Sequence, residues 1–182
     1  MANRYQSNDL ILYIEALFVA AGMDADKSAI VAPLLVEADL MGHTTHGIAQ
    51  APADLSGLEN GLMKGTGDPL VVADRGATIT WDGQRISGVW LTAKAIDLAI
   101  ERSKKYGTAT IAIRRSGHIA CLAAFLSRAT EKGCMIELAS SDPSIVSVAP
   151  YGGTKPAFTP NPIAVGIPTS DNPILIDISA SI

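Results

Sequence analysis

The stretch that decides the fold is residues 37–47, which read Glu-Ala-Asp-Leu-Met-Gly-His-Thr-Thr-His-Gly. Its first half completes an apolar pattern of helical spacing, and Gly42 ends that helix. His43 and His46 then flank two threonines in a polar hinge before the next helical pattern. An unperturbed histidine has a pKa of about 6.5, so it can exchange a proton with a substrate near neutral pH.

Three interpretations of this hinge remain open on its residues alone. His46 is a candidate acid/base, with Thr45 beside it to orient the ring or to pass the proton onward. Both histidines can instead bond to backbone groups at a helix terminus. His43 and His46 can also share a metal ion, provided that His118 or a distant carboxylate supplies a third ligand.

Toward the amino terminus the sequence predicts helices. A first apolar stripe ends before Gly22, which suits the left-handed residue that follows a helix. A second helix opens at Asp24, and Pro33 inside its pattern predicts a kink or a late helix start. On the other side of the hinge a third helix is predicted over residues 49–59, with a proline near its first turn.

After Gly61 the pattern changes to short strands alternating with helices. A long amphipathic helix is capped by Ser87 and ends at Gly107. We therefore predict an α+β fold in which a helical segment is followed by a mixed sheet with helices. The remaining predicted elements are strands at residues 69–72, 77–81, 108–113, 134–139, 163–167 and 174–178, and a helix at residues 119–132.

The change of pattern near residues 64–67 suggests two domains. Segment 1–66 is helical and carries the histidine hinge, and segment 67–182 is the first part of an α+β domain. The sequence stops directly after the apolar strand at 174–178, and a domain rarely ends a few residues past a buried strand. We therefore expect the sequence to be part of a longer polypeptide.

Composition excludes several classes of protein. The 182 residues are 48% hydrophobic and 18% charged, a composition that predicts a folded and not a disordered chain. The net charge of −4 argues against a nucleic-acid or anionic-membrane partner. Apolar runs are too short to cross a bilayer, the first residues do not resemble a signal peptide, and two cysteines make no disulfide framework. These features indicate a cytoplasmic protein.

A second candidate site surrounds His118, in the turn between a predicted strand and a predicted helix. Small residues and unpaired N–H groups at a helix start can bind an anion such as a cofactor phosphate, although a capping turn that binds nothing has the same pattern. The turn at Thr159 and the strand end at Asp177 are equally ambiguous alone. No Gly-x-Gly-x-x-Gly follows a predicted strand, so the Rossmann fingerprint is absent. Neither a complete phosphate loop nor a Gly-x-Ser-x-Gly motif occurs.

Together these segments resemble one known family, the type-2 malate/L-lactate dehydrogenases, which are NAD(P)-dependent oxidoreductases without a Rossmann fold. The resemblance begins near Leu10 and covers the rest of the chain. Because family members are longer, it implies that this sequence is their amino-terminal portion, with an incomplete fold of the same type. The segments that carry it are residues 37–47, Ser116-Gly117-His118, Ala149-Pro150-Tyr151-Gly152-Gly153, Asn161-Pro162-Ile163-Ala164 and residues 176–181.

The resemblance implies roles for matching positions. His46 corresponds to the catalytic acid/base, and Thr45 stands where the family often has a serine that works with that histidine. Gln50 stands where the family commonly has an arginine for the substrate carboxylate, and Thr159 is the second residue assigned to substrate binding. The residues assigned to NAD or NADP are His118, Ile119, Ala120, Cys121 and Leu122 in one turn and Asp177, Ile178 and Ser179 in another.

The resulting hypothesis is an oxidoreductase that transfers a hydride between NAD(P)H and a small 2-oxo acid or cyclic imine acid. Such an enzyme would work as a homodimer, without a metal ion, nucleic acid or membrane. One alternative is a metal-dependent hydrolase or lyase that uses His43, His46 and His118. The other is an inactive, truncated relative that only folds or pairs.

Overall fold

The computed structural model describes residues 4–180 and divides into two compact units, Met1–Phe125 and Leu126–Ile182. The change from helices to strands near residues 64–67 falls inside the first unit. The division into domains 1–66 and 67–182 therefore stays a prediction. No helix in the described part of the chain combines the length and the apolar character that a membrane span needs.

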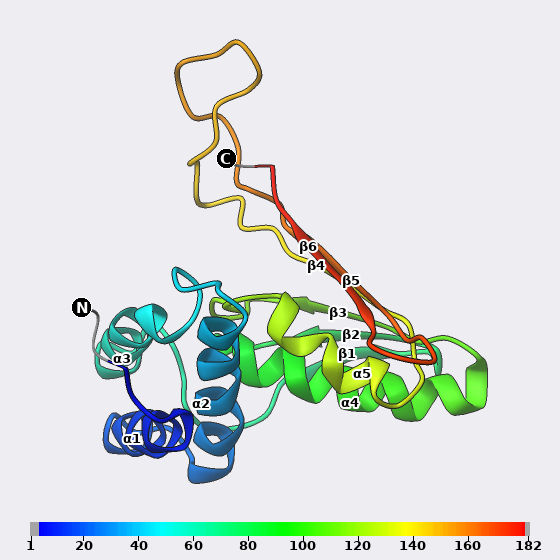
Figure 1. Cartoon of the computed structure of the whole chain (residues 1–182), viewed down its shortest axis with the longest axis horizontal. Helices are drawn as coiled ribbons and strands as arrows, with labels where there is room; N and C mark the ends of the chain where they lie inside the picture. The colour runs from blue at the N-terminus through cyan, green and yellow to red at the C-terminus, as the bar shows by residue number, and fades with distance from the viewer. Residues whose placement is uncertain (1–3, 181–182) are drawn as a thin grey trace. The chain divides into compact units, whose positions relative to one another are not determined.

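The first unit begins with helices, as predicted. Ile14 and Phe18 of α1 are buried, as are Val31 and Leu35 of α2, and the two helices pack against each other (Figure 1). The second helix is continuous and includes Pro33, so it does not start late. The helical elements are α1 (Ser7–Ala20), α2 (Ala25–Leu40), the short 3-10 turn η1 (Ile48–Gln50) and α3 (Ala51–Glu59).

A small sheet and one long helix complete this unit. Strand β2 pairs antiparallel with β1 and parallel with β3, and α4 makes the crossover between β2 and β3 along one face of the sheet (Figure 1). Ile79 and Trp81 of β2 pack against Ala95 of α4. Gly107 ends α4 with a φ of +79°, as its position in the sequence predicts. The bounds are β1 (Leu70–Asp74), β2 (Thr78–Asp82), α4 (Gly88–Tyr106) and β3 (Thr110–Arg114).

The helix predicted over residues 119–132 does not form as one element, and this prediction is wrong. Ala120 has a φ of +55°, and a residue in this left-handed region cannot continue a right-handed helix. Residues 118–122 are therefore irregular. Residues 120–126 are all buried, which explains the continuous apolar pattern without a helix. Only the short turns η2 (Ala123–Phe125) and α5 (Ser127–Thr130) are helical.

The second unit is an antiparallel sheet with α5 packed on its central strand, β5. A Cβ at Gly166 of β5 would stand 2.9 Å from Thr130 Cγ2 and 3.1 Å from Leu126 Cβ, so the close packing requires glycine. Between β4 and β5 the chain runs through a long irregular segment (Figure 1). The strands are β4 (Ile136–Ala139), β5 (Ile163–Ile167) and β6 (Ile174–Ile178).

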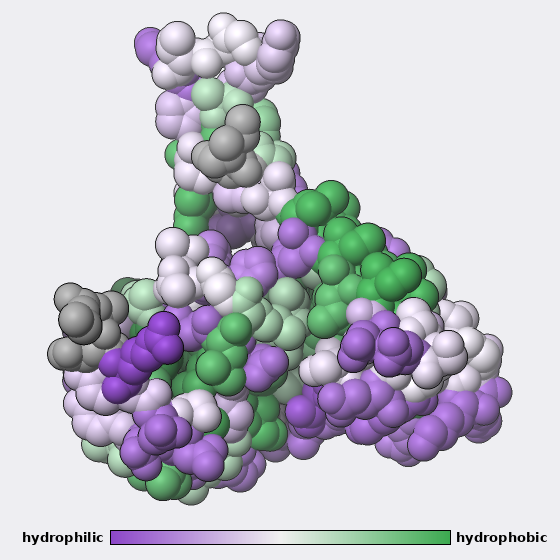
Figure 2. Space-filling view, viewed as in Figure 1, coloured by the Kyte–Doolittle hydropathy of each residue, from purple (hydrophilic) through white to green (hydrophobic). Residues whose placement is uncertain are grey.

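Much of the apolar surface of this sheet is exposed. Figure 2 shows hydrophobic residues gathered over the strands of this unit. Large exposed apolar areas in a soluble chain mark surfaces that pack against other protein. The exposed side chains on β5 and β6 are Ile163, Ile174, Leu175, Ile176 and Ile178.

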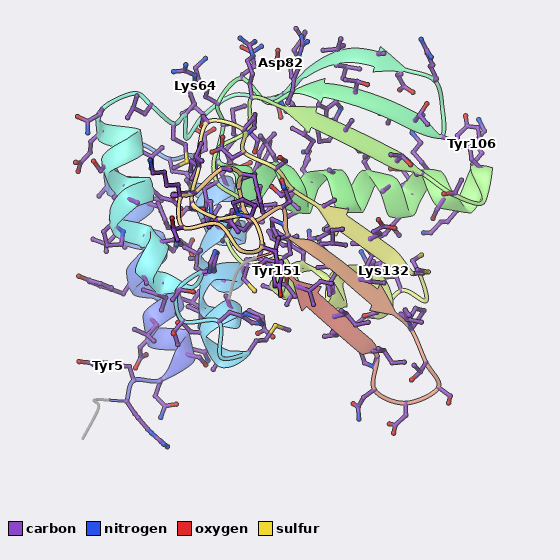
Figure 3. The ribbon with its side chains drawn as sticks, turned by 90° about the horizontal axis from the view of Figure 1, so that it is seen from above. Tyr5, Lys64, Asp82, Tyr106, Lys132 and Tyr151 are labelled. Atoms are coloured by element: carbon purple, nitrogen blue, oxygen red, sulfur yellow. The ribbon has the colours of Figure 1, made fainter. Side chains whose placement is uncertain are left out.

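Asp82, at the end of β2, ties the first sheet to the turns that follow β2 and β3. It is 2% exposed, and its carboxylate accepts hydrogen bonds from Arg115 Nε at 2.9 Å, from Gln84 N at 3.0 Å and from Arg114 Nε at 3.2 Å. Figure 3 shows Asp82 near Lys64, at the end of the sheet opposite Tyr106. The hydrogen bond from Arg115 is the main reason that the pKa of Asp82 lies below its ordinary value of 3.8.

We predict that Asp82→Asn lowers the free energy of unfolding at neutral pH. Because the pKa is depressed in the folded state, the carboxylate stabilises the fold above its ordinary pKa, and this contribution is lost as the pH falls through the folded value. The difference between variant and parent should therefore shrink below pH 3.8. Urea unfolding across this range, with the exposed Asp171→Asn as control, checks it; a difference that does not depend on pH would contradict it.

The pKa of Asp54, in α3, is shifted in the opposite direction to that of Asp82. Asp54 is 8% exposed, and burial raises the pKa of its carboxyl from 3.8 to about 6. A raised pKa means that the stability of the fold is greatest below the ordinary value and declines as the pH rises through about 6. At neutral pH the chain therefore carries a buried charge that weakens it.

Asp54→Asn is expected to stabilise the chain at mildly alkaline pH by up to about 3 kcal/mol, the free-energy equivalent of the pKa shift. The gain should vanish as the pH falls from about 6 toward 3.8. Thermal or urea unfolding at several pH values measures it. Glu59→Gln, an exposed carboxyl on the same helix, is the matched control. An equal gain at both ends of the pH range would show that the burial of this charge is not the cause.

Candidate active site

The histidine hinge is a compact turn that begins where α2 ends. Gly42 has a φ of +90°, and the His43 N–H bonds back to the Ala38 carbonyl at 2.8 Å, which closes the helix in a Schellman motif. The His46 N–H then donates to the His43 carbonyl at 2.9 Å. This double turn leaves the side chains of His43, Thr45 and His46 exposed at the surface of the first unit.

Thr45 and His46 form a hydrogen-bonded pair. Thr45 Oγ1 and His46 Nδ1 are 2.9 Å apart, so one ring nitrogen is occupied by the hydroxyl and Nε2 is left for another partner. Gln50 lies beside them, and its Nε2 donates to the Thr45 carbonyl at 2.6 Å. The structure thus brings together three residues of the predicted site, two assigned to catalysis and one to substrate binding.

The segment that carries His118 meets this turn, although the two are far apart in the sequence. The ring centroids of His46 and His118 are 5.9 Å apart, with an interplanar angle of 33°. His118 Nδ1 accepts a hydrogen bond from the Ala120 N–H at 3.2 Å. The helix start that the sequence predicts here does not form, because the backbone of residues 118–122 is irregular. Anion binding by this turn stays a prediction.

Cys121, in the same segment as His118, contacts the end of α2 and the histidine turn from the protein interior. Its side chain is buried against Ala38 of α2, and its sulfur lies within 4.8 Å of a ring nitrogen of His43. Within residues 4–180, His43, His46 and His118 are not gathered as a three-histidine metal site. Of the candidate cofactor residues in this segment, Ala120, Cys121 and Leu122 are buried, whereas His118 is exposed.

The remaining candidates belong to the second unit and are brought together there. Asp177 is half-buried in β6, opposite Ala164 of β5, while Ile178 and Ser179 are exposed at the strand end. Thr159 is 9% exposed. The hydrogen bond from the Ala180 N–H to the Pro160 carbonyl, 2.8 Å long, joins the turn at Thr159 to this strand end.

Asp39 is a residue that the sequence analysis missed. Its Oδ2 accepts a hydrogen bond from the Ile48 N–H at 2.8 Å, directly beyond the histidine turn. A signal for it exists in the sequence. An acidic residue in the last turn of a helix is unfavourable to the helix dipole, so its presence before His43 suggests a local task.

Comparisons with known proteins show which family this chain resembles. The family model of malate/L-lactate dehydrogenase matches residues 5–182. An L-sulfolactate dehydrogenase of Methanothermobacter thermautotrophicus is 28% identical over 98% of this chain and 52% of its own length. A Δ1-pyrroline-2-carboxylate/Δ1-piperideine-2-carboxylate reductase of Pseudomonas syringae pv. tomato is 31% identical over 94% of the chain and 50% of its own length.

Solved structures give the same result. The crystal structure of malate dehydrogenase from Entamoeba histolytica superimposes with a TM-score of 0.93 at 26% identity, over 100% of this chain and 50% of that one. The α+β fold class and the resemblance drawn from the sequence are therefore confirmed. The chain spans about half the length of the curated relatives it matches. With a family match that covers residues 5–182, this chain belongs to the malate/L-lactate dehydrogenase family.

Proposed function

We propose that this chain carries the acid/base part of an NAD(P)-dependent oxidoreductase that interconverts a small 2-oxo acid and its 2-hydroxy acid. A cyclic imine acid and its 2-amino acid form are the related substrate pair. The observation that carries the proposal is the exposed Thr45–His46 pair beside His118, within a chain of a dehydrogenase family.

His46 is the proposed proton donor and acceptor. Because the Thr45 hydroxyl occupies Nδ1, Nε2 is the ring atom that would give its proton to the substrate oxygen during reduction and take it back during oxidation. When bound, NAD or NADP supplies or accepts the hydride at the substrate carbon. The protein then needs only to position the acid, to hold the two ligands and to move one proton.

Two segments are proposed to hold the cofactor. The first is residues His118, Ile119, Ala120, Cys121 and Leu122, which belong to neither a helix nor a sheet, so their backbone can bond to a ligand. The second is Asp177, Ile178 and Ser179 at the end of β6. The first segment fits the role, because its exposed imidazole stands beside that of His46.

Gln50 and Thr159 are the proposed substrate-binding residues. Gln50 donates one amide hydrogen to the Thr45 carbonyl, and its second amide hydrogen and its oxygen are the groups it would offer to a bound acid. The substrates named for the relatives include sulfolactate and cyclic imine carboxylates, which share a carboxylate next to the reacting carbon. That shared unit is the substrate class we propose.

The proposal also covers the assembly and its setting. A cytoplasmic homodimer, with no nucleic acid or membrane, remains what the family resemblance and the composition suggest. The alternative of a metal-dependent hydrolase or lyase is not favoured, because the relatives are dehydrogenases and reductases. The inactive-relative alternative is decided by the first experiment below.

We predict that His46→Ala lowers NAD(P)H-dependent turnover of 2-oxo acids by about 10² to 10⁴, the usual contribution of a general acid/base. Cofactor affinity should stay unchanged, because the imidazole acts on the substrate oxygen. Absorbance of the reduced nicotinamide measures turnover against a panel of 2-oxo and cyclic imine acids. Fluorescence titration with NADH and with NADPH measures binding and decides between the two cofactors.

His43→Ala is the matched control, since His43 is exposed in the same turn and holds no proposed catalytic role. Equal losses in the two variants would remove the acid/base assignment. A parent chain that binds neither NADH nor NADPH would instead support the inactive-relative alternative.

A second prediction concerns Gln50→Arg. A guanidinium at this position can keep a donor on the Thr45 carbonyl and add paired, charge-assisted bonds to the substrate carboxylate. The KM for 2-oxo acids should fall about tenfold, and kcat should change little. Steady-state kinetics of the parent, Gln50→Arg and Gln50→Ala provide the measurement. A KM that is the same in all three would show that the side chain at position 50 does not face the substrate.

A further inference from the structure

Asp39 connects the two sides of the histidine turn. It lies in the last turn of α2, and its Oδ2 accepts the hydrogen bond from the Ile48 N–H, nine residues further along the chain. Ile48 is the first residue of η1, which leads directly into α3. A carboxylate is favourable at a helix start, where N–H groups lack partners, so Asp39 caps the next helix from the end of the previous one.

Gly47 shows how closely this carboxylate packs. A Cβ at Gly47 would stand 2.5 Å from Asp39 Oδ2 and 2.7 Å from Oδ1, closer than side-chain atoms tolerate. The φ of Gly47 is −95°, so this glycine is not in the left-handed region, and a side chain here would meet the Asp39 carboxylate. The carboxylate therefore rests on the peptide that directly follows His46.

The other side of the turn is also tied. Gln50 Nε2 bonds to the Thr45 carbonyl at 2.6 Å, and the Gln50 N–H bonds to the Gly47 carbonyl at 3.0 Å. His46 thus lies between two fixed points. One is the Thr45 carbonyl held by Gln50, and the other is the Gly47–Ile48 peptide held by Asp39.

We propose that Asp39 is a positioning residue for His46. Its carboxylate fixes the turn so that the Thr45 hydroxyl meets Nδ1 and Nε2 is presented outward. Asp39 touches neither imidazole nor substrate in this role; it acts through the Ile48 N–H and the Gly47 backbone. The catalytic consequence rests on the proposed function, whereas the effect on the ring does not, and the two can be measured separately.

The test uses nuclear magnetic resonance on the complete chain labelled with ¹⁵N, in which three histidines contribute imidazole signals. In Asp39→Ala the ring nitrogen shifts of His46 should move toward those of a histidine in water, because Nδ1 loses the Thr45 hydroxyl. Exchange protection of the Ile48 amide should fall about ten- to a hundredfold, the range for losing a bond to a charged acceptor. Asp39→Asn keeps an acceptor oxygen and should restore both signals.

The matched control is Asp26→Ala, which removes an exposed carboxylate from the first turn of the same helix. It should leave the His46 ring and the Ile48 amide unchanged. Signals in Asp39→Ala that equal those of the parent would overturn the positioning role. So would a failure of Asp39→Asn to restore them.

Gly47→Ala gives an independent route to the same contact. Its added methyl group must displace the Asp39 carboxylate, so it should produce the same change at His46 and Ile48 as Asp39→Ala. Combining both substitutions should add nothing further, because both break one contact. Unaltered signals in Gly47→Ala, or fully additive effects in the double variant, overturn the inference. If Asp39→Ala does not fold, Gly47→Ala and Asp39→Asn still predict opposite results.

Turnover separates this inference from the proposed function. If the ring signals change as expected but His46→Ala keeps full turnover, the positioning holds and the acid/base assignment fails. If the signals stay constant while His46→Ala loses turnover, the acid/base assignment holds and Asp39 has no part in it.

Discussion

The site depends on one close backbone contact, between Gly88 at the start of α4 and Gly117 after β3. A Cβ on Gly88 would overlap the Gly117 carbonyl oxygen, so only glycine lets these two segments touch. The Gly117 N–H completes the contact with a 3.0 Å bond to the Ile86 carbonyl. Because His118 directly follows Gly117 in the chain, this contact fixes the backbone position from which the His118 imidazole extends. The imidazoles of His118 and His46 therefore lie close together partly because Gly88 and Gly117 have no side chains.

The scaffold that holds these exposed groups is α2, a helix with one buried face. On one face of α2, Ala38 packs against Cys121 and its alanine neighbours Ala123 and Ala124, and at its end the chain turns into the histidine hinge. Helix α2 thus contacts both candidate segments. It holds the segment after His118 by apolar packing and the histidine turn through the carboxylate of Asp39. Polar groups at the surface can keep a fixed geometry when the inner face of the element that carries them is well packed.

The elements that the sequence predicts well are those with a local cause. For α4, the spacing of apolar residues and the glycine at its end are sufficient to predict the helix. The strands β5 and β6 also occur at the predicted residues. Residues 119–132 show where this reasoning fails, because an apolar run is equally consistent with a buried irregular segment, and the left-handed Ala120 is set by its surroundings. Asp39 was missed for a related reason: its partner Ile48 lies across a turn whose path the sequence does not specify.

A neutral amide at position 50 couples two properties that a charged residue could separate. Gln50 holds the Thr45 carbonyl and is also the group proposed to face the substrate acid. A substrate carboxylate would bond to the second amide hydrogen of Gln50 while the first stays on the Thr45 carbonyl, so both bonds would share one planar amide group. Substrate affinity and the position of His46 would then depend on the same amide group. An enzyme built this way would favour substrates whose carboxylate reaches the amide in the position it already occupies, so shape would contribute more to selection than charge.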